Sequence, residues 1–400
     1  MRILICASDL PLRPLNTGFR RQLDGLLPAL GVRNDVRLVG YRMPEQVMPD
    51  VVDARVHVVD YRRPGVLENA WDATAAVLRG RPLRAARLAG GLRPALREEL
   101  ATFQPDVVHV GPGKLAGLLG DLGGRPAILG VMDTWHLNVE ARVAASSGLR
   151  RAILAADVTR IKRWEARRYR GWDRIVPSNE DDLAVLRSLD PTLAFDLIPI
   201  GFDASAYAPD PAATRDPNRI MFHGAMDYPP NVEAVEHLAN GVLPRVRAQR
   251  PTAHLVIAGR DPAPRVRDLA ALPGVTVTGE VEDMRAELTK SRVWVGPFVS
   301  GTGIKTKLLE AMATDLPCVV TPTGGRGLEL DSGAFLVGST DEELAGHVIN
   351  LLDDEGLAAG IGRAGGDYVR ARYDWPVVAR AFERLYEEVI AEKQRAAAQA

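Results

Sequence analysis

Short apolar runs alternate with longer segments of helical periodicity along the whole chain. In the first half, the runs that predict buried strands are Arg2–Ala7, Val36–Val39, Arg55–Val59, Asp106–Val110, Ala127–Met132, Arg174–Val176 and Phe195–Ile198. In the second half they are Arg219–His223, His254–Ala258, Val275–Thr278, Val293–Val295 and Cys318–Thr321. Strands that are separated by helices usually pair in parallel. The pattern therefore predicts an α/β fold in which helices cover both faces of parallel sheets.

One interruption divides this pattern into two domains. Residues 208–218 are rich in proline and show no periodicity, and the alternation begins again after them. A chain of 400 residues also exceeds what one hydrophobic core usually organises. We therefore predict two Rossmann-like, doubly wound domains with parallel sheets. The predicted boundaries are 1–205 for the first domain, 206–218 for a linker, 219–375 for the second domain and 376–400 for a final amphipathic helix, of which residues 395–400 are expected to fray.

Composition and the two cysteines indicate a globular protein in a reducing compartment. Apolar residues make up 46% of the chain and charged residues 25%, and no uncharged apolar stretch is long enough to span a bilayer. The apolar start of the chain meets Asp9 too soon for an export signal, so we interpret it as a strand. Cys6 and Cys318 lie in strand-like apolar runs, as expected of reduced core cysteines. We expect a cytoplasmic location.

Charge is unevenly distributed between the two halves. Residues 1–200 hold 29 basic and 23 acidic side chains, whereas residues 201–400 hold 21 and 28. One basic cluster, from Arg160 to Arg174, is interleaved with tryptophan and tyrosine. An ordinary solvated face is the favoured interpretation, and peripheral contact with the inner face of an anionic membrane stays open. Nucleic-acid binding is not expected, because no recognised module accompanies the charge.

A glycine-rich turn between a strand and a helix is the strongest candidate site. Ser300–Gly303 follows the strand-like run Val293–Phe298 and precedes a helix predicted from about Ile304 to Thr314. Small residues let backbone amides approach an anion closely, and the helix dipole adds positive charge at the same place. Lys305 adds a full charge, in a chain with only six lysines. The pattern favours a diphosphate ligand, and a tight turn with a solvated lysine is the alternative.

The residues after this turn extend the site and carry a family resemblance. Glu310 lies two turns into the predicted helix, where its carboxylate could accept hydrogen bonds from vicinal hydroxyls such as those of a ribose. The stretch from Gly301 to Ala313, with residues 316–320, resembles the donor-site signature of family 4 glycosyltransferases, which are retaining enzymes of the GT-B fold. Further matches follow the family order at 105–110, 198–203, 222–226, 257–260 and 279–283, so the resemblance covers nearly the whole chain.

The resemblance implies an activity and roles for particular residues. It implies transfer of a sugar from a nucleoside-diphosphate sugar to a hydroxyl acceptor. Glu310 is expected to hold the donor ribose, the backbone at Val281 to meet the base, and residues 303–306 to contact the diphosphate. Gly18 matches a loop that closes on the donor, and the final helix is expected to cross back to the first domain. The expected substrate-binding residues are Gly18, His109, His136, Gly224, Val281, Gly301, Thr302, Gly303, Ile304, Lys305, Thr306 and Glu310.

Two departures from the family pattern affect the expected chemistry. Family members often carry a glutamate that touches the transferred sugar, and Thr302 stands in its place. The basic pair that often follows the first strand of the donor domain is also missing. We therefore assign the positive charge for the leaving diphosphate to Lys305 and Arg260. Lys307 ranks third, because it would lie roughly 200° around a helix from Lys305.

Asp133 is expected to be catalytic together with Lys305 and Arg260. It follows a predicted strand, where its carboxylate could meet a hydroxyl of the acceptor or the sugar. His109 and His136 are alternatives, although a lone histidine at a strand end is more often packed than catalytic. In the retaining family the usual proposal is front-face attack assisted by the leaving phosphate, so no enzymatic nucleophile is assigned. We expect no cofactor and no metal, because no Asp-x-Asp motif ends a strand.

Other functions on the same architecture define the alternatives. A nucleotide-sugar epimerase or phosphorylase stays open, as does a non-catalytic subunit that binds a nucleotide sugar and activates a partner. A Rossmann dehydrogenase is excluded because the glycine-rich turn lacks a third glycine. A P-loop is excluded because Gly111–Lys114 lacks the earlier glycine and the following serine or threonine. The donor base, the sugar, the acceptor and the oligomeric state are not determined by the sequence.

Overall fold

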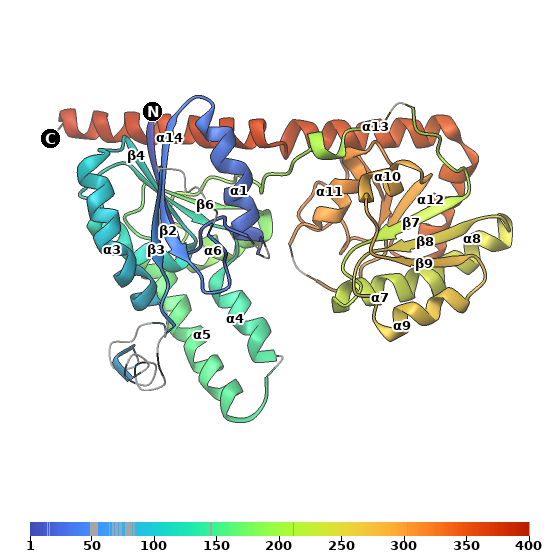
Figure 1. Ribbon diagram of the computed structural model, residues 1–400, viewed down its shortest axis with the longest axis horizontal. Helices are drawn as coiled ribbons and strands as arrows, with labels where there is room; N and C mark the ends of the chain where they lie inside the picture. The colour runs from blue at the N-terminus through green and yellow to red at the C-terminus, as the bar shows by residue number, and fades with distance from the viewer. Residues whose placement is uncertain are drawn as a thin grey trace. The chain divides into compact units, whose positions relative to one another are not determined.

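The computed structural model places the chain in two compact units, each built on one sheet (Figure 1). It describes residues 1–13, 15, 17–48, 55–63, 65, 68, 71, 74–76, 82, 85–144, 146–210, 212–301 and 303–399. The first unit consists of Met1–Gly201 with Val378–Ala400, and the second of Phe202–Val377. The division thus falls just ahead of the segment that the sequence predicts as a linker. Arg215, from that segment, is anchored on the second unit by hydrogen bonds to the carbonyls of Ser291, Thr314 and Asp315.

The first unit contains a six-stranded parallel sheet in the spatial order β3-β2-β1-β4-β5-β6. Its strands are β1 (Arg2–Ala7), β2 (Asp35–Arg42), β3 (Val56–Asp60), β4 (Val107–Gly111), β5 (Ala127–Val131) and β6 (Arg174–Pro177). The central strands are buried on both faces, which is why they read as continuous apolar runs. The strand order reverses between β1 and β4, and ligands of such sheets bind beyond the carboxyl ends at this point.

Helices of the first unit cover both faces of this sheet. They are α1 (Gly18–Gly31), α3 (Ala85–Thr102), the 3₁₀ segment η1 (Gly113–Asp121), α4 (Trp135–Ala144), α5 (Gly148–Arg168) and α6 (Glu180–Leu189). Thr17 begins α1, because its side-chain oxygen accepts a hydrogen bond from the Arg20 amide. Leu23, Leu26 and Leu30 then recur at helical spacing and are buried.

Helices α4 and α5 form a hairpin that projects beyond the sheet (Figure 1). Val139, Val158 and Ile161 are buried between the two helices. The outer end is different, because Leu149 and Ile153 at the start of α5 are 78% and 48% exposed. The hairpin therefore carries apolar side chains into solvent at its tip.

The second unit repeats the same strand order in a second parallel sheet, β12-β11-β10-β7-β8-β9. The strands are β7 (Arg219–His223), β8 (His254–Ala258), β9 (Val275–Gly279), β10 (Val293–Gly296), β11 (Cys318–Val320) and β12 (Leu336–Val337). The order reverses between β7 and β10, and the glycine-rich turn follows β10. The sequence candidate therefore lies at the position where this fold binds ligands.

The connections of the second unit are mostly helical. They are η2 (Ser205–Tyr207), α7 (Pro229–His237), the π-helical turn η3 (Leu238–Val242), α8 (Leu243–Gln249), α9 (Pro264–Asp268), η4 (Leu269–Ala271), α10 (Met284–Thr289), α11 (Thr306–Ala313), α12 (Asp341–Asp353) and α13 (Glu355–Arg372). Trp294 is the largest fully buried side chain, stacked against Phe222 with 5.8 Å between the ring centroids. Leu308, Leu309 and Met312 place α11 against the same core.

The last helix, α14 (Trp375–Gln399), packs on the first unit from Val378 onward. Phe382 lies 5.2 Å from the His109 ring, between centroids, and Tyr386 bonds to the same histidine. Arg174 of β6 donates to Glu392 at 2.7 Å. The predicted return of the final helix to the first domain is thus confirmed.

Two sequence predictions of local structure are wrong in detail, and one short strand was missed. The segment Phe195–Ile198 makes only an isolated bridge with β6, because that strand ends at Pro177, which has no N–H to donate. Leu336–Val337 forms a strand that is too short to read as an apolar run. The predicted fraying of residues 395–400 is not found over residues 395–399, since alanines favour the helix and Lys393 pairs with Asp173.

Candidate functional site

The glycine-rich turn has the backbone geometry of an anion site. Gly301 and Gly303 have φ angles of 101° and 67°, in the left-handed region that glycine adopts without steric cost. Thr302, between them, lies outside the described residues, so the prediction for it is not tested. Helix α11 begins soon afterwards at Thr306. The N–H groups of Thr306 and Lys307 have no partner within the helix, whereas the Leu308 N–H donates to the Lys305 carbonyl at 2.8 Å. Ile304 packs beside Gly327, where a Cβ would lie 2.7 Å from its side chain.

Two ammonium groups lie over one aromatic ring beside this turn. Lys305 Nζ donates to the Gly303 carbonyl at 2.9 Å and lies 5.8 Å from the Phe298 ring centroid. Lys307 Nζ donates to Asn231 Oδ1 at 2.9 Å and lies 5.4 Å from the same centroid. The predicted separation of the two lysines around a helix is wrong, because Lys305 is the extended N-cap residue and precedes α11. Burial lowers the pKa of Lys307, and the nearby Glu310 charge opposes this shift.

Glu310 is oriented by a chain of two hydrogen bonds. The indole Nε1–H of Trp294 donates to His223 Nδ1 at 3.0 Å, and His223 Nε2 lies 2.7 Å from Glu310 Oε2. An indole only donates, so His223 Nδ1 is the acceptor and its Nε2 carries the proton that it gives to the carboxylate. His223 is 3% exposed, whereas the Glu310 side chain is 24% exposed. The Glu310 carboxylate is therefore fixed by His223 and still partly exposed at this edge.

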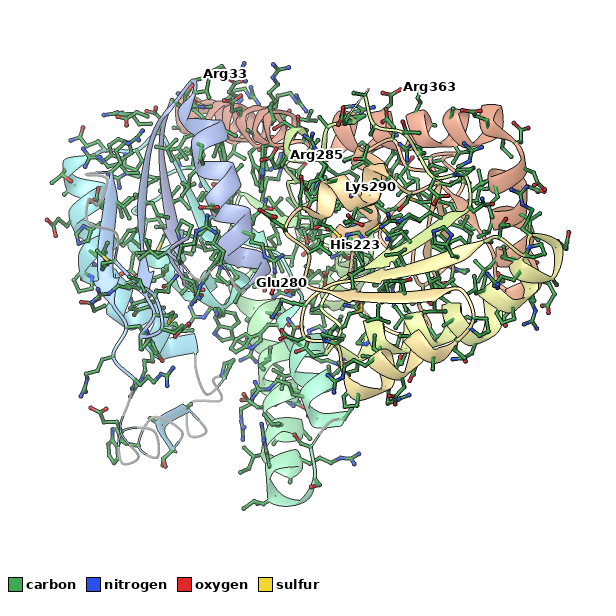
Figure 2. All side chains as sticks on the ribbon, turned by 45° about the vertical axis from the view of Figure 1, so that its right-hand side comes forward. Arg33, His223, Glu280, Arg285, Lys290 and Arg363 are labelled. Atoms are coloured by element: carbon green, nitrogen blue, oxygen red, sulfur yellow. The ribbon has the colours of Figure 1, made fainter. Side chains whose placement is uncertain are left out.

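The carboxyl ends of β7, β8 and β9 complete this edge of the second sheet. Each strand leads into a glycine with positive φ, at 224, 259 and 279. A Cβ on Gly259 would lie 1.7 Å from the Gly224 carbonyl oxygen, so the two loops touch through their backbones. Figure 2 shows His223 and Glu280 at this same edge. Val281 follows and packs partly buried against the core.

Arg260 and Tyr207 border this edge in different ways. The Arg260 side chain is 61% exposed and pairs with Asp261 at 2.9 Å. Burial raises the pKa of the Tyr207 phenol, and the charges of Glu310 and Asp283 add to the effect. Tyr207 therefore lies near Glu310 as a neutral hydroxyl.

In the first unit, Gly18 packs against the side chain of Met132, the residue before Asp133. A Cβ on Gly18 would lie 3.6 Å from Met132 Cε, and Asp133 is the next residue. Asp133 is exposed, and neighbouring atoms still partly desolvate its carboxyl. This desolvation raises the pKa of Asp133, as does the charge of Asp182, while a hydrogen bond with Asn138 lowers it.

The two predicted histidines have different surroundings. His109 Nδ1 lies 2.8 Å from the Tyr386 hydroxyl, and burial lowers the pKa of His109 to about 4. His136 Nδ1 lies 2.6 Å from Glu165 Oε2, and the other oxygen of this carboxylate accepts from the Trp135 amide. Both members of the His136–Glu165 pair are buried. His136 therefore fastens α4 to α5, which is the packed role that the sequence offered as the alternative.

The described residues lack both a cluster suited to a metal ion and a helix suited to span a membrane. Within the part of the chain that the structure describes, no group of three or more His, Cys, Asp or Glu side chains is placed to hold a metal ion. Among the same residues, no helix combines the length and apolar character needed to cross a membrane.

The second unit matches a family of known sequence pattern. Residues 217–354 match the family described as glycosyl transferases group 1. Residues 217–354 form a group 1 glycosyltransferase domain. The resemblance to glycosyltransferases is thus confirmed, whereas membership of the retaining family 4 stays a prediction. This domain contains both the glycine-rich turn and Glu310.

One curated relative and two solved structures extend the comparison. The phosphatidyl-myo-inositol mannosyltransferase of Mycolicibacterium smegmatis is 29% identical over 202 residues, which are 48% of this chain and 51% of that protein. The chain therefore spans about half the length of the curated relative. A sucrose-phosphate synthase from Thermosynechococcus elongatus superposes with a TM-score of 0.64 at 17% identity, covering 98% of this chain and all of that one. Anabaena HepE in complex with UDP gives 0.62 at 13% identity, covering 97% and 100%. These likenesses confirm the two-domain GT-B fold.

The glycosyltransferase domain collects the predicted donor residues, and it adds three that sequence reasoning missed. Gly224, Val281, Gly301, Gly303, Ile304, Lys305, Thr306 and Glu310 all lie at or beside the carboxyl edge of its sheet. The missed residues are His223, Trp294 and Asn231, which hold Glu310 and Lys307. A signal for His223 was present, because it ends β7 within the segment 222–226 that carries the family resemblance. Nothing in the sequence pairs it with a carboxylate 87 residues away.

Proposed function

We propose that the protein is a retaining glycosyltransferase that moves a hexose from a nucleoside-diphosphate sugar to a hydroxyl acceptor. The family match of the second unit supports the activity. The mannosyltransferase relative and the UDP-bound structural neighbour support a nucleotide-sugar donor. The retaining outcome follows from the family 4 resemblance alone.

The observation that carries the proposal is the pairing of an anion turn with an oriented carboxylate. The turn supplies two left-handed glycines, the first N–H groups of α11 and the ammonium groups of Lys305 and Lys307. Glu310, held by His223, lies one helical turn farther along α11 than Lys307 and suits the two hydroxyls of a ribose. A diphosphate and a ribose are adjacent in every nucleoside diphosphate, so one ligand satisfies both features.

In the proposed reaction, the bond between the sugar C1 and the diphosphate oxygen breaks and a bond from C1 to the acceptor oxygen forms. The acceptor proton passes to the departing diphosphate, so no enzymatic nucleophile takes part. Lys305 and Arg260 meet the charge that develops on the diphosphate, and the buried lysine gains from its low-dielectric surroundings. Asp133 is proposed to contact a hydroxyl of the acceptor or the sugar, and the donor contact of Gly18 stays a prediction.

Replacement of Glu310 by alanine tests the donor site. We expect the stabilisation of the wild-type protein by a saturating nucleoside diphosphate, screened as UDP, GDP, TDP and ADP, to fall by at least half in Glu310→Ala. Glu355→Ala is the matched control, because Glu355 is exposed at the start of α13. Near the end of the preceding helix, α12, the Leu351 carbonyl accepts a hydrogen bond from Arg292. Arg292 comes just before β10, so this end of α12 lies at the opposite edge of the sheet from the glycine-rich turn. Equal ligand-induced shifts in Tm for both variants and the wild type would contradict the assignment.

Nucleoside diphosphate release separates the rival functions. A transferase releases the diphosphate faster when an acceptor is added. An epimerase or phosphorylase of this fold acts on the donor without an acceptor, and a non-catalytic subunit binds the nucleotide but releases none without its partner. The measurement is release from the donor alone, with candidate acceptors and with partner proteins.

We propose that transfer needs neither a metal ion nor another cofactor. The lysines beside the turn provide positive charge where other enzymes use a divalent cation. Activity should therefore be within twofold after treatment with EDTA. Loss of activity in EDTA that Mg²⁺ or Mn²⁺ restores would contradict this.

The α4–α5 hairpin is the proposed surface for peripheral membrane contact in the cytoplasm. Leu149 and Ile153 share one face of α5, with Arg150 and Arg151 beside them. Exposed apolar side chains next to cations favour anionic lipid. In Leu149→Ser, binding to vesicles that contain about 30% anionic lipid should fall severalfold. Equal sedimentation of wild type and variant with these vesicles would remove this surface.

A further inference from the structure

An apolar pocket opens in the first unit on the face of the sheet that α1 and α14 cover. Side chains alternate between the two faces of a strand, so Cys6 and Val110 pack on the opposite face while Ile5 and His109 line the pocket. Helix α1 contributes four side chains and α14 contributes Phe382. Every lining residue belongs to the first unit. The pocket is thus complete within that unit.

The position of this pocket is that of a ligand site. Its wall includes Gly111 and Val131, the last residues of β4 and β5, and Ser178, which follows β6. It therefore opens at the carboxyl edge where sheets of this order bind ligands. It encloses about 40 Å³ of free space. One water needs roughly 10–15 Å³ of such space, so the pocket has room for one small group.

His109 provides one polar group in this apolar wall. The Tyr386 hydroxyl has no hydrogen-bond partner other than His109 Nδ1 among the residues that the structure places. A hydroxyl hydrogen needs an acceptor when it is buried, so Tyr386 donates to Nδ1 and the proton of the neutral ring lies on Nε2. Within the described chain Nε2 has no partner, and the absent side chain at Gly130 leaves it uncovered, since a Cβ there would lie 2.7 Å away. Nε2–H is therefore a fixed donor at the wall.

The absence of charge from the wall limits what can bind. Of the described residues that line the pocket, none is Asp, Glu, Lys or Arg. A phosphate or carboxylate would lose its hydration there without gaining a counter-charge. A polyhydroxylated ring would find too few partners for its hydroxyls, because only Gln22, Ser178 and His109 carry polar side chains. A neutral, apolar group with a single oxygen matches the wall.

We propose that this pocket binds a neutral apolar ring of the glycosyl acceptor, with His109 Nε2–H donating to an oxygen on that ring. The inference rests on the proposed function, since the acceptor is defined by the transfer reaction. It specifies the substrate class as ring-bearing alcohols whose ring carries no phosphate or carboxylate. Glycosylation of such a ring then joins the donor sugar to an apolar aglycone.

Direct binding of small neutral alcohols tests the pocket. The probes are phenol and cyclohexanol, with myo-inositol and phenyl phosphate as polar and anionic comparisons, measured on the full chain by ligand-detected NMR titration. We expect Kd values of roughly millimolar for the two apolar alcohols, as suits ligands of this size. myo-Inositol and phenyl phosphate should bind at least tenfold more weakly. Phenyl phosphate binding as tightly as phenol would overturn the proposal.

Two variants with matched controls locate the binding. Ile200 is half-buried and lines the pocket, so Ile200→Trp should fill it and weaken phenol at least tenfold. Leu193 is half-buried against the core on the other face, and Leu193→Trp should leave phenol binding within twofold. His109→Phe should weaken phenol severalfold and leave toluene, which has no oxygen, within twofold. Equal effects of the two tryptophan variants, or of His109→Phe on both ligands, would overturn the assignment.

The role of the ring as acceptor has its own readout. Phenol and cyclohexanol should raise nucleoside diphosphate release from the donor at least fivefold over the rate without an alcohol. If these alcohols bind in the pocket, as shown by weaker binding in Ile200→Trp, but leave nucleoside diphosphate release unchanged, the acceptor role would be overturned. Failure of the proposed function is seen separately, as loss of the Glu310-dependent stabilisation by nucleoside diphosphate, which does not involve the first unit's pocket.

Discussion

The carboxyl edges of the two sheets share one strand order but present different chemistry. In the second unit, three neighbouring strands lead into glycines with positive φ, and the edge carries backbone amides, two largely buried ammonium groups and an oriented carboxylate. In the first unit, no described strand ends in such a glycine, and the pocket at the edge is lined mainly by apolar side chains, with His109, Gln22 and Ser178 as its polar ones. One edge is built for a charged, hydrogen-bonding ligand and the other for an apolar one.

This difference teaches how one architecture divides the two halves of a transfer reaction. A diphosphate is bound by many partial charges at fixed positions, which a bare backbone supplies best. A neutral ring is bound by contact area, which needs side chains and tolerates changes in their shape. Substitutions that touch the backbone should therefore harm the second edge most. Substitutions that remove a titrating group should instead affect the edge of the first unit.

The largest effect is expected from a methyl group at Gly259. A Cβ there would lie 1.7 Å from the Gly224 carbonyl, so Gly259→Ala must displace a loop that ties β7, β8 and β9 together. We expect a loss of about 3 kcal/mol or more in the stability of the second unit. For a unit of this size the loss corresponds to a fall of roughly 6–12 °C in Tm by calorimetry.

Gly18→Ala is the matched change in the first unit. The new Cβ would lie 3.6 Å from Met132 Cε, an ordinary contact, and alanine favours the first turn of α1. The stability of the first unit in Gly18→Ala should remain within about 0.5 kcal/mol of the wild type. A similar fall in Tm for both variants would show that the two edges do not differ in their tolerance of side chains.

Acid should weaken the first unit through His109. Its pKa is lowered to about 4 by burial, whereas an unfolded histidine titrates near about 6.5. As the pH falls below the unfolded value, the unfolded chain takes up the proton first, so stability is lost between about pH 6.5 and pH 4 and is complete above that window. We expect a loss of about 2–3 kcal/mol between pH 7 and pH 4.5.

The measurement is urea unfolding at the two pH values, with hydrogen exchange of β4 and β7 amides to assign each transition to its unit. His109→Phe removes the titrating group and should flatten the dependence of the first unit by the same amount. The remaining titratable groups are the same in both proteins, so their contributions to the pH dependence cancel in this comparison. An unchanged slope in the variant would mean that His109 takes up its proton as readily folded as unfolded.

The sequence predicted the backbone of this protein better than its side-chain partnerships. Buried parallel strands are continuous apolar runs, so β1, β7 and β8 were predicted with their observed bounds. The glycine-rich turn was also predictable, because positive φ requires glycine locally. The link from Trp294 through His223 to Glu310 was not, since only the packing of the sheet brings these residues together. The pocket is a property of packing as well, and its apolar wall reads in the sequence as ordinary core.

The smallest effect tests whether side chains also matter at the second edge. Trp294→Phe keeps an aromatic ring against Phe222 but removes the Nε1–H that fixes the proton of His223 on the nitrogen facing Glu310. We expect the Kd for nucleoside diphosphate to rise about five- to tenfold, or roughly 1 kcal/mol, with KM for the donor rising in parallel and kcat nearly unchanged. His223→Gln retains one donor and one acceptor, so its effect should be smaller than that of His223→Ala. A purely structural role for Trp294 would lower Tm without this change in KM, and the second edge would then depend on its backbone alone.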